Sequence, residues 1–307
     1  MFRYYFIRVF AVLMCAVMLV FIPAGNSEKY DVRDKDACVM NFAVFSDVHV
    51  EGNNTARYKV FTGSLKALKN NEHGHDYLAF LGDNTMNGQV FENMLFHGAV
   101  AASGWANKTI IANGNHDSGN SAGDSASLLQ RYIGFRNAFY GDKGDRPYYT
   151  FRDERGFRFI VLGEEFDGDN ESVFTDAQFE WLIDCLDSAA AEGDYTFIMT
   201  HYPSYYIEND NYDFEEVISR YKNVLYLYGH THMPFLEWSF DDIAEGVYGV
   251  NLPRLTELAG SGDNEIYHGT GWGLEVEAYE DEVLVRVKNF YTGEWDEELE
   301  HTYEIIK

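Results

Sequence analysis

The chain has 307 residues, with 50 acidic and 23 basic side chains, so its formal net charge at neutral pH is −27. Such an acidic surface repels phosphate backbones and excludes nucleic acid as the main partner, whereas a small phosphorylated ligand is compatible where bound cations dominate the local field. Hydrophobic residues make up 46% of the chain and prolines number only 5, which is typical of a folded protein with a substantial core.

The first 25 residues differ from the rest. Arg3 and Arg8 precede the uncharged apolar run Val9–Ile22, and small residues follow it. This order is typical of a secretory signal peptide, so we expect an exported protein from which residues 1–25 are removed. A retained membrane anchor is the alternative, because Phe2–Phe6 would lengthen the apolar stretch toward the ~20 residues of a membrane span.

Three cysteines are present, at positions 15, 38 and 185. A lipid attached to Cys15 is disfavoured because Met14, directly before it, is larger than the small residue expected there. Export would permit a disulfide between Cys38 and Cys185. Since Cys185 shares a predicted helix face with Leu182, a free buried thiol is the simpler interpretation.

The first half of the chain alternates strands and helices. Strands are predicted where β-branched and aromatic residues run together, and helices where apolar residues recur every three or four positions. In chain order these are a strand at Cys38–Phe45, a helix at Ala56–Lys69, a strand at Tyr77–Leu81, a helix at Gln89–Ala101 and a strand at Thr109–Ala112.

A glycine-rich insertion, Ser118–Pro147, follows the third strand and contains a predicted short helix at Ser127–Ile133. A long insertion at this point is a candidate lid over a substrate, and a surface excursion without a role is the alternative. Within it, Arg131, Arg136 and Arg146 are candidates for contact with a substrate phosphate, although ordinary surface charge explains them more simply.

The second half has more antiparallel character. Its predicted elements are a hairpin of Tyr148–Phe151 with Phe157–Leu162, a helix that begins at the capping box Thr175–Gln178 and ends at Gly193, strands at Tyr195–Met199 and Val224–Tyr228 around a helix at Phe214–Tyr221, a short strand near Gly246–Asn251, and a hairpin of Leu274–Tyr279 with Val283–Asn289. The pattern favours one α/β domain, residues 38–307, in which two sheets pack together with helices outside.

Five predicted strands end in polar residues that can bind metals. Ligands bind at the carboxyl ends of strands in open α/β sheets, so these residues are expected to share one site. They are Asp47, His49, Asp83, Asn115, His201, His230 and His232. A carboxylate can bridge two cations, and imidazole, carboxylate and amide ligands together suit Mn, Fe or Zn, so the set predicts two divalent or trivalent ions.

The same segments, in the same order, resemble the blocks of the calcineurin-like metallophosphoesterases. The matching blocks are Asp47-Val48-His49, Gly82-Asp83-Asn84, Gly114-Asn115-His116-Asp117, His201 and Gly229-His230-Thr231-His232. The resemblance runs from about Asn41 to the C-terminus. It implies a four-layer α/β sandwich, in which two mixed sheets are flanked by helices, with a dimetal site at the C-terminal ends of the strands.

The resemblance also implies a role for each matching residue. One metal would be held by Asp47, His49 and His232, Asp83 would bridge, and the second metal would be held by Asn115, His201 and His230. His116 would bind the phosphate and protonate the leaving oxygen, a general-acid role worth ~10²–10⁴-fold. Asp117 is expected to orient His116, from adjacency alone. The implied reaction is hydrolysis of a phosphomonoester or phosphodiester by a metal-bridging hydroxide.

Two features bear on the subclass. Gly163-Glu164-Glu165 departs from the family pattern, because relatives often have aspartate followed by serine or threonine there, and we assign it no function. The segments Trp272-Gly273-Leu274 and Thr292-Gly293-Glu294-Trp295 are similar to those of exported bacterial members, including purple-acid-phosphatase-like ones. No tyrosine is placed as an iron ligand, so that subclass is not assigned.

The remaining histidines are not expected to bind metal. His73 and His75 precede a strand, at the sheet edge opposite the site, and His97 falls within a helix, whereas His268 and His301 lie outside every block. The aromatic residues of the second half offer another candidate feature. They either wall the pocket and stack on a base or ring of the substrate, or simply pack their loop, and they are Tyr202, Tyr205, Tyr206 and Tyr212.

The sequence therefore predicts an exported metal-dependent phosphoesterase with a small phosphorylated substrate. Contact with a membrane is expected only through an uncleaved N-terminal segment. Two alternatives stay open: a phosphodiesterase for cyclic nucleotides or lipid head groups, and a catalytically silent metal-binding surface protein. The presence of His116 argues against the silent protein, because a structural metal site has no use for a general acid.

Overall fold

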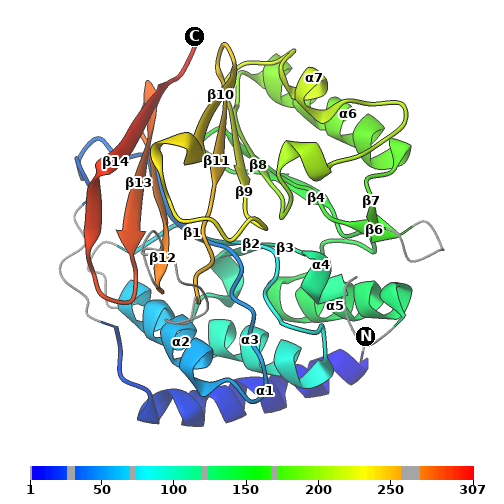
Figure 1. Ribbon diagram of the computed structural model, residues 1–307, viewed down its shortest axis with the longest axis vertical. Coiled ribbons are helices and arrows are strands. Elements are labelled where there is room, and N and C mark those ends of the chain that lie inside the picture. The colour runs from blue at the N-terminus through cyan, green and yellow to red at the C-terminus, as the bar shows by residue number, and fades with distance from the viewer. Residues whose placement is uncertain (1, 26–31, 70–73, 119–123, 167–171, 257–269) are drawn as a thin grey trace.

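The computed structural model describes residues 2–25, 32–69, 74–118, 124–166, 172–256 and 270–307. Two six-stranded sheets pack face to face, and helices cover the outer side of each sheet (Figure 1). The four-layer α/β sandwich expected from the sequence is thus confirmed.

The first sheet has the strand order β14-β13-β12-β1-β2-β3. Its parallel part is β1 (Met40–Phe45), β2 (Tyr77–Leu81) and β3 (Thr109–Ala112), and its antiparallel part is β12 (Trp272–Ala278), β13 (Glu282–Asn289) and β14 (Trp295–Glu304). In the parallel part Phe45 lies opposite Phe80, which lies beside Ile111. The loops after these three strands therefore leave the same edge of the sheet.

The second sheet has the order β10-β11-β9-β8-β5-β4. Four neighbouring strands are parallel: β11 (Val247–Asn251), β9 (Val224–Tyr228), β8 (Tyr195–Met199) and β5 (Phe157–Val161). The antiparallel edges are β10 (Phe240–Ala244) and β4 (Tyr149–Arg152), and a separate small pair is formed by β6 (Glu165–Phe166) and β7 (Ser172–Val173).

One helix layer lies outside each sheet. The first layer contains α1 (Phe2–Phe21), α2 (Thr55–Lys69), α3 (Val90–Ala102) and α5 (Ser125–Tyr140), and the second contains α6 (Asp176–Glu192) and α7 (Phe214–Ile218). The single turn α4 (Asn115–Ser118) follows β3, and 3₁₀ turns occupy η1 (Ala106–Lys108), η2 (Ser204–Tyr206) and η3 (Glu237–Ser239). By length and composition α1 is long enough to cross a membrane, a property that signal sequences share.

Aromatic side chains fill the space between the sheets. The ring of Phe42 meets those of Phe159 and Phe197 edge to face, at centroid distances of 5.6 Å and 5.0 Å. Every residue of β1, β8 and β9 is buried because both faces of these strands are covered. Burial of such side chains stabilises the fold by about 1.5–3 kcal/mol each, and it fixes the strands that carry the polar loops.

The insertion after β3 differs from the expectation. A short helix at Ser127–Ile133 was predicted, but α5 runs on to Tyr140, and its Phe135 and Phe139 are buried in the core beneath the first sheet. Aromatic residues past position 133 continue the apolar face, so packing extends the helix. The described part of the insertion belongs to the helix layer and does not form a lid.

The arginines of this insertion hold local structure. Arg136 is fully buried and donates to the carbonyl oxygens of Gly144 and Pro147, so the interpretation as surface charge was wrong for this residue. Arg131 donates to the carbonyl of Gly88 and Arg146 to the Tyr148 hydroxyl.

The structure tests the expected ends of α6 and the expected state of the cysteines. Gly193 ends α6 with a left-handed φ of 71°, and Thr175 caps its start by accepting from the Gln178 amide. The Gln178 side chain instead binds both backbone groups of Gly163. The cysteines at 15, 38 and 185 are all free thiols, so the alternative of a Cys38–Cys185 disulfide is not realised.

Candidate metal centre

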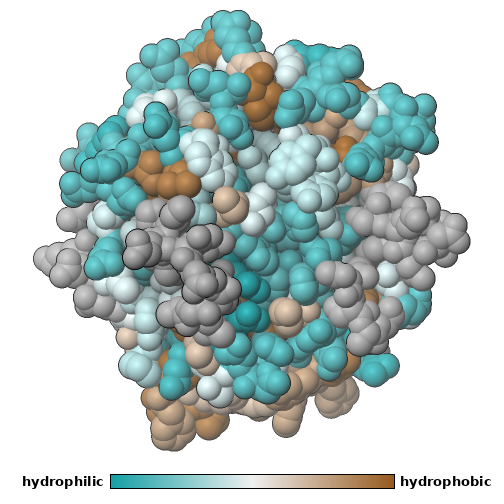
Figure 2. Space-filling model, viewed as in Figure 1, coloured by the Kyte–Doolittle hydropathy of each residue, from teal (hydrophilic) through white to brown (hydrophobic). Residues whose placement is uncertain are grey.

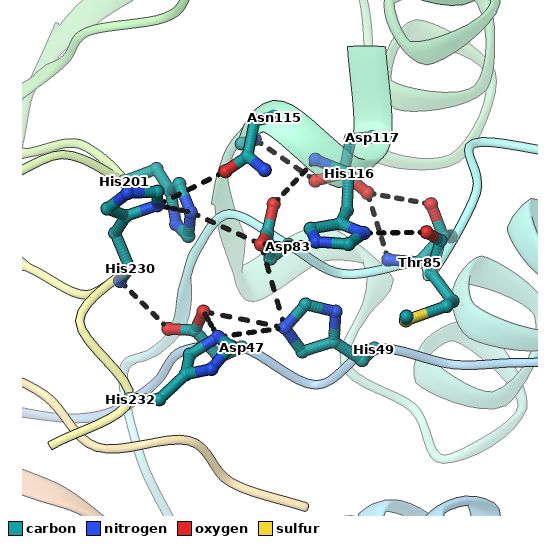
Figure 3. Close-up of polar contacts among 12 residues, drawn as sticks. Asp47, His49, Asp83, Thr85, Asn115, His116, Asp117, His201, His230 and His232 are labelled. Atoms are coloured by element: carbon teal, nitrogen blue, oxygen red, sulfur yellow. Dashed lines mark hydrogen bonds and ion pairs between the residues drawn. The ribbon is translucent and has the colours of Figure 1, made fainter. Parts of the chain in front are cut away.

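The loops that follow β1, β2, β3, β8 and β9 meet at one point, where their polar side chains face one another (Figure 3). The structure brings together there all seven side chains predicted as ligands, and His116 lies beside them. The oxygen donors and His49 come from loops of the first sheet. The loops of the second sheet contribute His201, His230 and His232.

Four of these side chains form one compact group. Their candidate ligand atoms all lie within 4.8 Å of one another, and they belong to Asp47, His49, Asp83 and His232. The Nε2 of His232 is 2.9 Å from Asp47 Oδ1 and 3.2 Å from His49 Nε2. Three of the four are buried, and His232 is partly exposed.

A second group adjoins the first through Asp83. The Nε2 of His201 is 3.3 Å from Asp83 Oδ2 and 3.1 Å from His230 Nδ1. The same His230 nitrogen lies 3.2 Å from Asn115 Oδ1. Because Asp83 Oδ2 is also 3.6 Å from His49 Nε2, this one carboxylate stands between both groups.

The donor set fits a pair of metal ions. Pairs of imidazole nitrogens approach to 3.1–3.2 Å, and a shared cation is a physical reason for lone pairs to converge in this way. Close to the buried Asp47 Oδ1 lie two imidazole nitrogens, His232 Nε2 at 2.9 Å and His49 Nε2 at 3.6 Å. Buried carboxylates together with buried or partly exposed imidazole and amide donors suit the ions of the first transition series.

Backbone carbonyls fix the orientation of two imidazoles. His201 Nδ1 lies 3.0 Å from the carbonyl oxygen of Leu81, and His116 Nδ1 lies 2.7 Å from that of Met86. A carbonyl only accepts, so each Nδ1 carries its proton and each Nε2 is left to face the centre. The Ser46 hydroxyl likewise donates to Asp47 Oδ2, at 2.6 Å.

The backbone at the centre is strained. Six non-glycine residues in the described part of the chain have a positive φ, and five of them are candidate ligands: Asp47, His49, Asp83, His230 and His232. Left-handed backbone costs on the order of 1 kcal/mol or more for each such residue and persists only where the surroundings enforce it. Because the strained conformation is concentrated at the candidate ligands, we infer that these loops hold it in order to direct those side chains to the centre.

Close packing of the loops also requires a glycine. A Cβ on Gly114 would lie 2.4 Å from Asp83 Oδ1 and 2.7 Å from His201 Cδ2. No side chain fits there, because real Cβ atoms do not approach other atoms so closely. Gly114 therefore allows the loop after β3 to reach the central carboxylate.

The charges of the centre shift several pKa values. Burial opposes ionisation of Asp83, but the neighbouring His201 outweighs it and lowers the pKa of Asp83 to about 2. Burial likewise opposes protonation of His201, but Asp83 and Asp47 raise its pKa to about 10. Burial lowers the pKa of His49 and of His230 to about 4. Two buried carboxylates thus favour positive charge at this point, as a cation site requires.

Asp117 has other partners than the sequence suggested. Its carboxylate accepts from the backbone and side chain of Thr85, from both nitrogens of Asn84 and from the Gly114 amide. The ring of His116 instead donates from Nδ1 to the carbonyl oxygen of Met86. Burial and the negative charge of Asp83 raise the pKa of Asp117 to about 6. Asp117 joins the loops after β2 and β3.

Sequence reasoning missed one residue behind the centre. Glu164, at which the chain departs from the family pattern, is buried and accepts from the hydroxyl of Tyr202 at 2.6 Å. The Tyr202 ring lies 5.2 Å from the His201 ring and 5.0 Å from the His230 ring. Only the departure itself signalled this position, because the pairing joins residues 38 positions apart.

The other tyrosines separate into two groups. Tyr206 is exposed and its ring lies 4.9 Å from that of His230, with Tyr205 beside it. Tyr212 instead stacks on Phe179 of α6, at 5.1 Å, and packs its loop.

The remaining described histidines lie outside the centre. His75 is buried and pairs with Glu275 at 2.8 Å, and His97 is buried with its Nδ1 2.8 Å from the Tyr140 hydroxyl. His301 stacks on Phe240 at 3.9 Å. These side chains pack or pair, while His73 and His268 lie outside the described residues.

Solved structures of other proteins share the fold of this chain. No curated protein matches the chain. A solved dimetal phosphatase from Danio rerio has a similar fold, with a TM-score of 0.61 and 15% identity over 88% of this chain and 100% of the other. A purple acid phosphatase from yellow lupin (Lupinus luteus) seeds gives a TM-score of 0.56 and 15% identity over 86% of this chain and 53% of the other.

The comparison with protein families is decisive. The model of the calcineurin-like phosphoesterases matches residues 40–234, a span that begins with β1 and contains every predicted ligand. Its members use a dinuclear metal site, and the structure provides a candidate cluster for one. The chain therefore belongs to the calcineurin-like phosphoesterase family and is a phosphoric ester hydrolase.

Proposed function

We propose that this chain is an exported phosphoesterase that hydrolyses small phosphomonoesters or phosphodiesters with two metal ions, and that His116 acts as its general acid. The observation that carries the proposal is the convergence of seven donor side chains from five loops, with Asp83 between the two groups. The basic residues before the apolar N-terminal run support export.

In the proposed arrangement each metal has its own set of side chains. Asp47, His49 and His232 hold one ion. Asn115, His201 and His230 hold the other, and the Asp83 carboxylate is shared. When bound, the two ions supply a water of lowered pKa as nucleophile and positive charge for the phosphoryl oxygens.

The position of His116 is suited to a general acid. Its Nδ1 proton is engaged by Met86, its Nε2 lies 4.0 Å from Asp83 Oδ2, and about a fifth of its side chain is exposed. Its backbone amide donates to Asp83 Oδ1 at 2.9 Å, which ties the imidazole to the central carboxylate. From this position Nε2 can hold a proton and deliver it to the leaving oxygen. Asp117 serves as a positioning residue, because it holds the loops on which Asp83 and His116 stand.

A second candidate function follows from the exposed tyrosines. Tyr206, beside His230, and its neighbour Tyr205 are more than half exposed. A flat ring on the substrate would therefore find an aromatic surface next to the proposed phosphate position. This favours a phosphodiester or monoester that carries a base or another aromatic ring.

The function is tested with metal-free protein reloaded with Mn²⁺, Zn²⁺ or Fe²⁺. We expect turnover of p-nitrophenyl phosphate or bis-p-nitrophenyl phosphate to return with about two metals per chain, measured by elemental analysis of the same samples. Preference for the diester identifies a phosphodiesterase, and preference for the monoester identifies a phosphatase. Two bound metals without hydrolysis of either compound, or of a panel of nucleotides and sugar phosphates, would overturn the proposal.

A further inference from the structure

The helix layer on the first sheet is basic, although the protein is strongly acidic. Its four helices carry eight basic residues and one acidic residue, Glu92, which is buried. The basic residues are Arg3, Arg8, Arg57, Lys59, Lys66, Lys69, Arg131 and Arg136. Arg136 is fully buried, so the other seven give this layer its basic character, in a chain with 50 acidic side chains.

The outer side of α1 is apolar and exposed. Eight of the fourteen large hydrophobic side chains exposed in the described part of the chain lie on α1. Six of them fall at helical spacing along one face: Phe6, Val9, Phe10, Leu13, Val17 and Val20. Leu13 is 63% exposed and Val17 is 62% exposed. Figure 2 shows hydrophobic atoms gathered along the lower edge of the molecule, where Figure 1 places α1.

The inner side of α1 packs closely against α3 and α5. Ala11 and Cys15 are fully buried against α3, and a Cβ on Gly98 of that helix would lie 2.7 Å from Cys15 Sγ. A Cβ on Gly134 of α5 would lie 2.5 Å from the Tyr4 ring. Two neighbouring helices thus carry glycine where α1 approaches, which is how helices come into close contact.

Polar contacts hold both ends of α1 to the domain. Arg8 donates to the carbonyl of Ala138 at 2.8 Å, near the end of α5. At the other end, Lys66 of α2 donates to the carbonyl oxygens of Leu19 and Ile22, which lack helical partners. The chain after the helix is held too, because the Gly25 amide donates to Gly63 at 3.1 Å. These contacts make α1 an integral part of the helix layer.

A basic cavity opens beside the helix. About 390 Å³ in volume, it is lined by Arg3, Tyr4 and Ile7 of α1 and by Val90, Gln130 and Arg131 of the neighbouring helices. A lining that combines two arginines with apolar side chains offers complementary surroundings to an anionic head group on an acyl chain.

We propose that residues 2–25 stay on the chain and that this basic, apolar face binds the surface of an anionic lipid bilayer. In this arrangement α1 lies flat, with its inner side on α3 and α5 and its outer side among the head groups and upper acyl chains. Exposed Lys59 and Lys69 flank Lys66 on α2 and add attraction to anionic lipids. For an exported chain the whole domain then lies on the outer side of the bilayer. The proposal keeps export and departs only from removal of the segment and from a spanning anchor.

Binding is tested by flotation of the full chain with vesicles of phosphatidylcholine, with and without phosphatidylglycerol. We expect at least about tenfold stronger binding to the anionic vesicles, reduced by salt. Leu13→Glu with Val17→Glu should weaken binding at least about tenfold, while the matched change Val39→Glu, on another face, should leave it unchanged. Equal binding by the Leu13/Val17 variant and the parent chain would overturn the proposal.

Charge and topology are tested separately. Lys59→Glu with Lys69→Glu should weaken binding to anionic vesicles about tenfold, whereas Lys222→Glu on the opposite half should not. In cells, the intact mass should include residues 2–25, and alkaline carbonate should release the protein from membranes. A mass that lacks this segment, or resistance to carbonate as for a spanning helix, would overturn the proposal. Phosphoesterase activity and circular dichroism of each variant report separately on the site and the fold.

Discussion

The two halves of the sandwich differ in the charge of their helices and in the ligands they supply. The four helices on the first sheet carry eight basic residues and one acidic residue, whereas α6 and α7 on the second carry seven acidic residues and no basic one. At the centre the pattern is different. The first sheet supplies all three oxygen donors, Asp47, Asp83 and Asn115, and the second sheet supplies only imidazoles.

This comparison separates what each half contributes. The carboxylates of the candidate centre stand on loops of the half whose helices are positive. The local carboxylates, and not the overall charge of that half, therefore favour a cation there. The acidic helices of the second half lie outside the centre and contribute to solubility.

The largest effect is expected from Asp83→Asn, in the first half. Loss of the shared negative charge should remove at least one metal and lower kcat by more than about a thousandfold, because the ions supply several kcal/mol of charge stabilisation. Turnover and metal content are measured on the same sample. The matched variant Asp194→Asn alters a buried carboxylate of the second half that pairs with Arg152 and Arg158, and it should affect only stability. Normal turnover of Asp83→Asn would refute the shared role.

The next effect distinguishes His116 from the imidazoles of the second half. His116→Ala should keep both metals but lose about 10²–10⁴-fold in kcat with an alkyl phosphate, and much less with p-nitrophenyl phosphate, whose leaving group needs little protonation. His201→Ala should lose metal as well as rate. His301→Ala, outside the centre, serves as the control. Equal losses with both substrates would exclude a general-acid role for His116.

A smaller effect concerns the stability of the first helix layer. Burial lowers the pKa of His97 to about 3, so the folded protein resists its protonation while the unfolded chain takes up a proton near pH 6.5. This contribution to stability is present above pH 6.5 and is lost as the pH falls toward 3. When the pH is lowered from 7.5 to 5, the free energy of unfolding should therefore fall by about 2 kcal/mol less in His97→Phe than in the parent chain. Urea unfolding at both pH values measures this difference.

His97→Phe remains compatible with packing, because the ring already stacks on Phe135 at 5.5 Å. The variant gives up the hydrogen bond to Tyr140, which lowers stability at every pH and leaves the slope as the informative quantity. An unchanged slope between the two proteins would show that His97 does not carry the acid sensitivity.

The smallest effect tests the acidic layer. Glu180 and Asp184 of α6 are both exposed and lie one helical turn apart, so they repel each other. Asp184→Lys should raise stability by about 0.5 kcal/mol at low salt, and the gain should vanish in high salt. Asp184→Ala removes the repulsion without adding an ion pair. The difference between the two variants therefore measures the contribution of the new ion pair. A gain that persists in high salt would point to a cause other than charge.

The elements that carry the centre could be predicted from the sequence because they are locally encoded. Apolar runs such as Tyr77–Leu81 and Thr109–Ala112 correspond to strands with the same limits. In contrast, β14 was missed, because its sequence WDEELEHTYE is acidic and only one of its residues is buried, as an edge strand permits. The length of α5 depends on the packing of Phe135 and Phe139 under the sheet, and no local signal reports that contact.

The same distinction between local signals and long-range contacts applies to the site. Strand ends and the family pattern led to the seven donors, which the structure places together. The partners of Asp117 and the pairing of Glu164 with Tyr202 join distant loops, so adjacency in the sequence misled in the first case and was silent in the second. The left-handed backbone of the donors was likewise not foreseen, because a positive φ is uncommon for any non-glycine residue, even for aspartate and histidine, which adopt it more often than most.

The donors of the centre come from both sheets and stand on strained backbone. Ions held as proposed would therefore cross-link the segment at Asp47 to the one at His232, which lie far apart in the chain. Since such ions bind only the folded chain, a hundredfold excess over the dissociation constant would add about 2.7 kcal/mol to stability. A chelator would then act on this protein as a mild denaturant, and the ions needed for hydrolysis would also hold the two halves together.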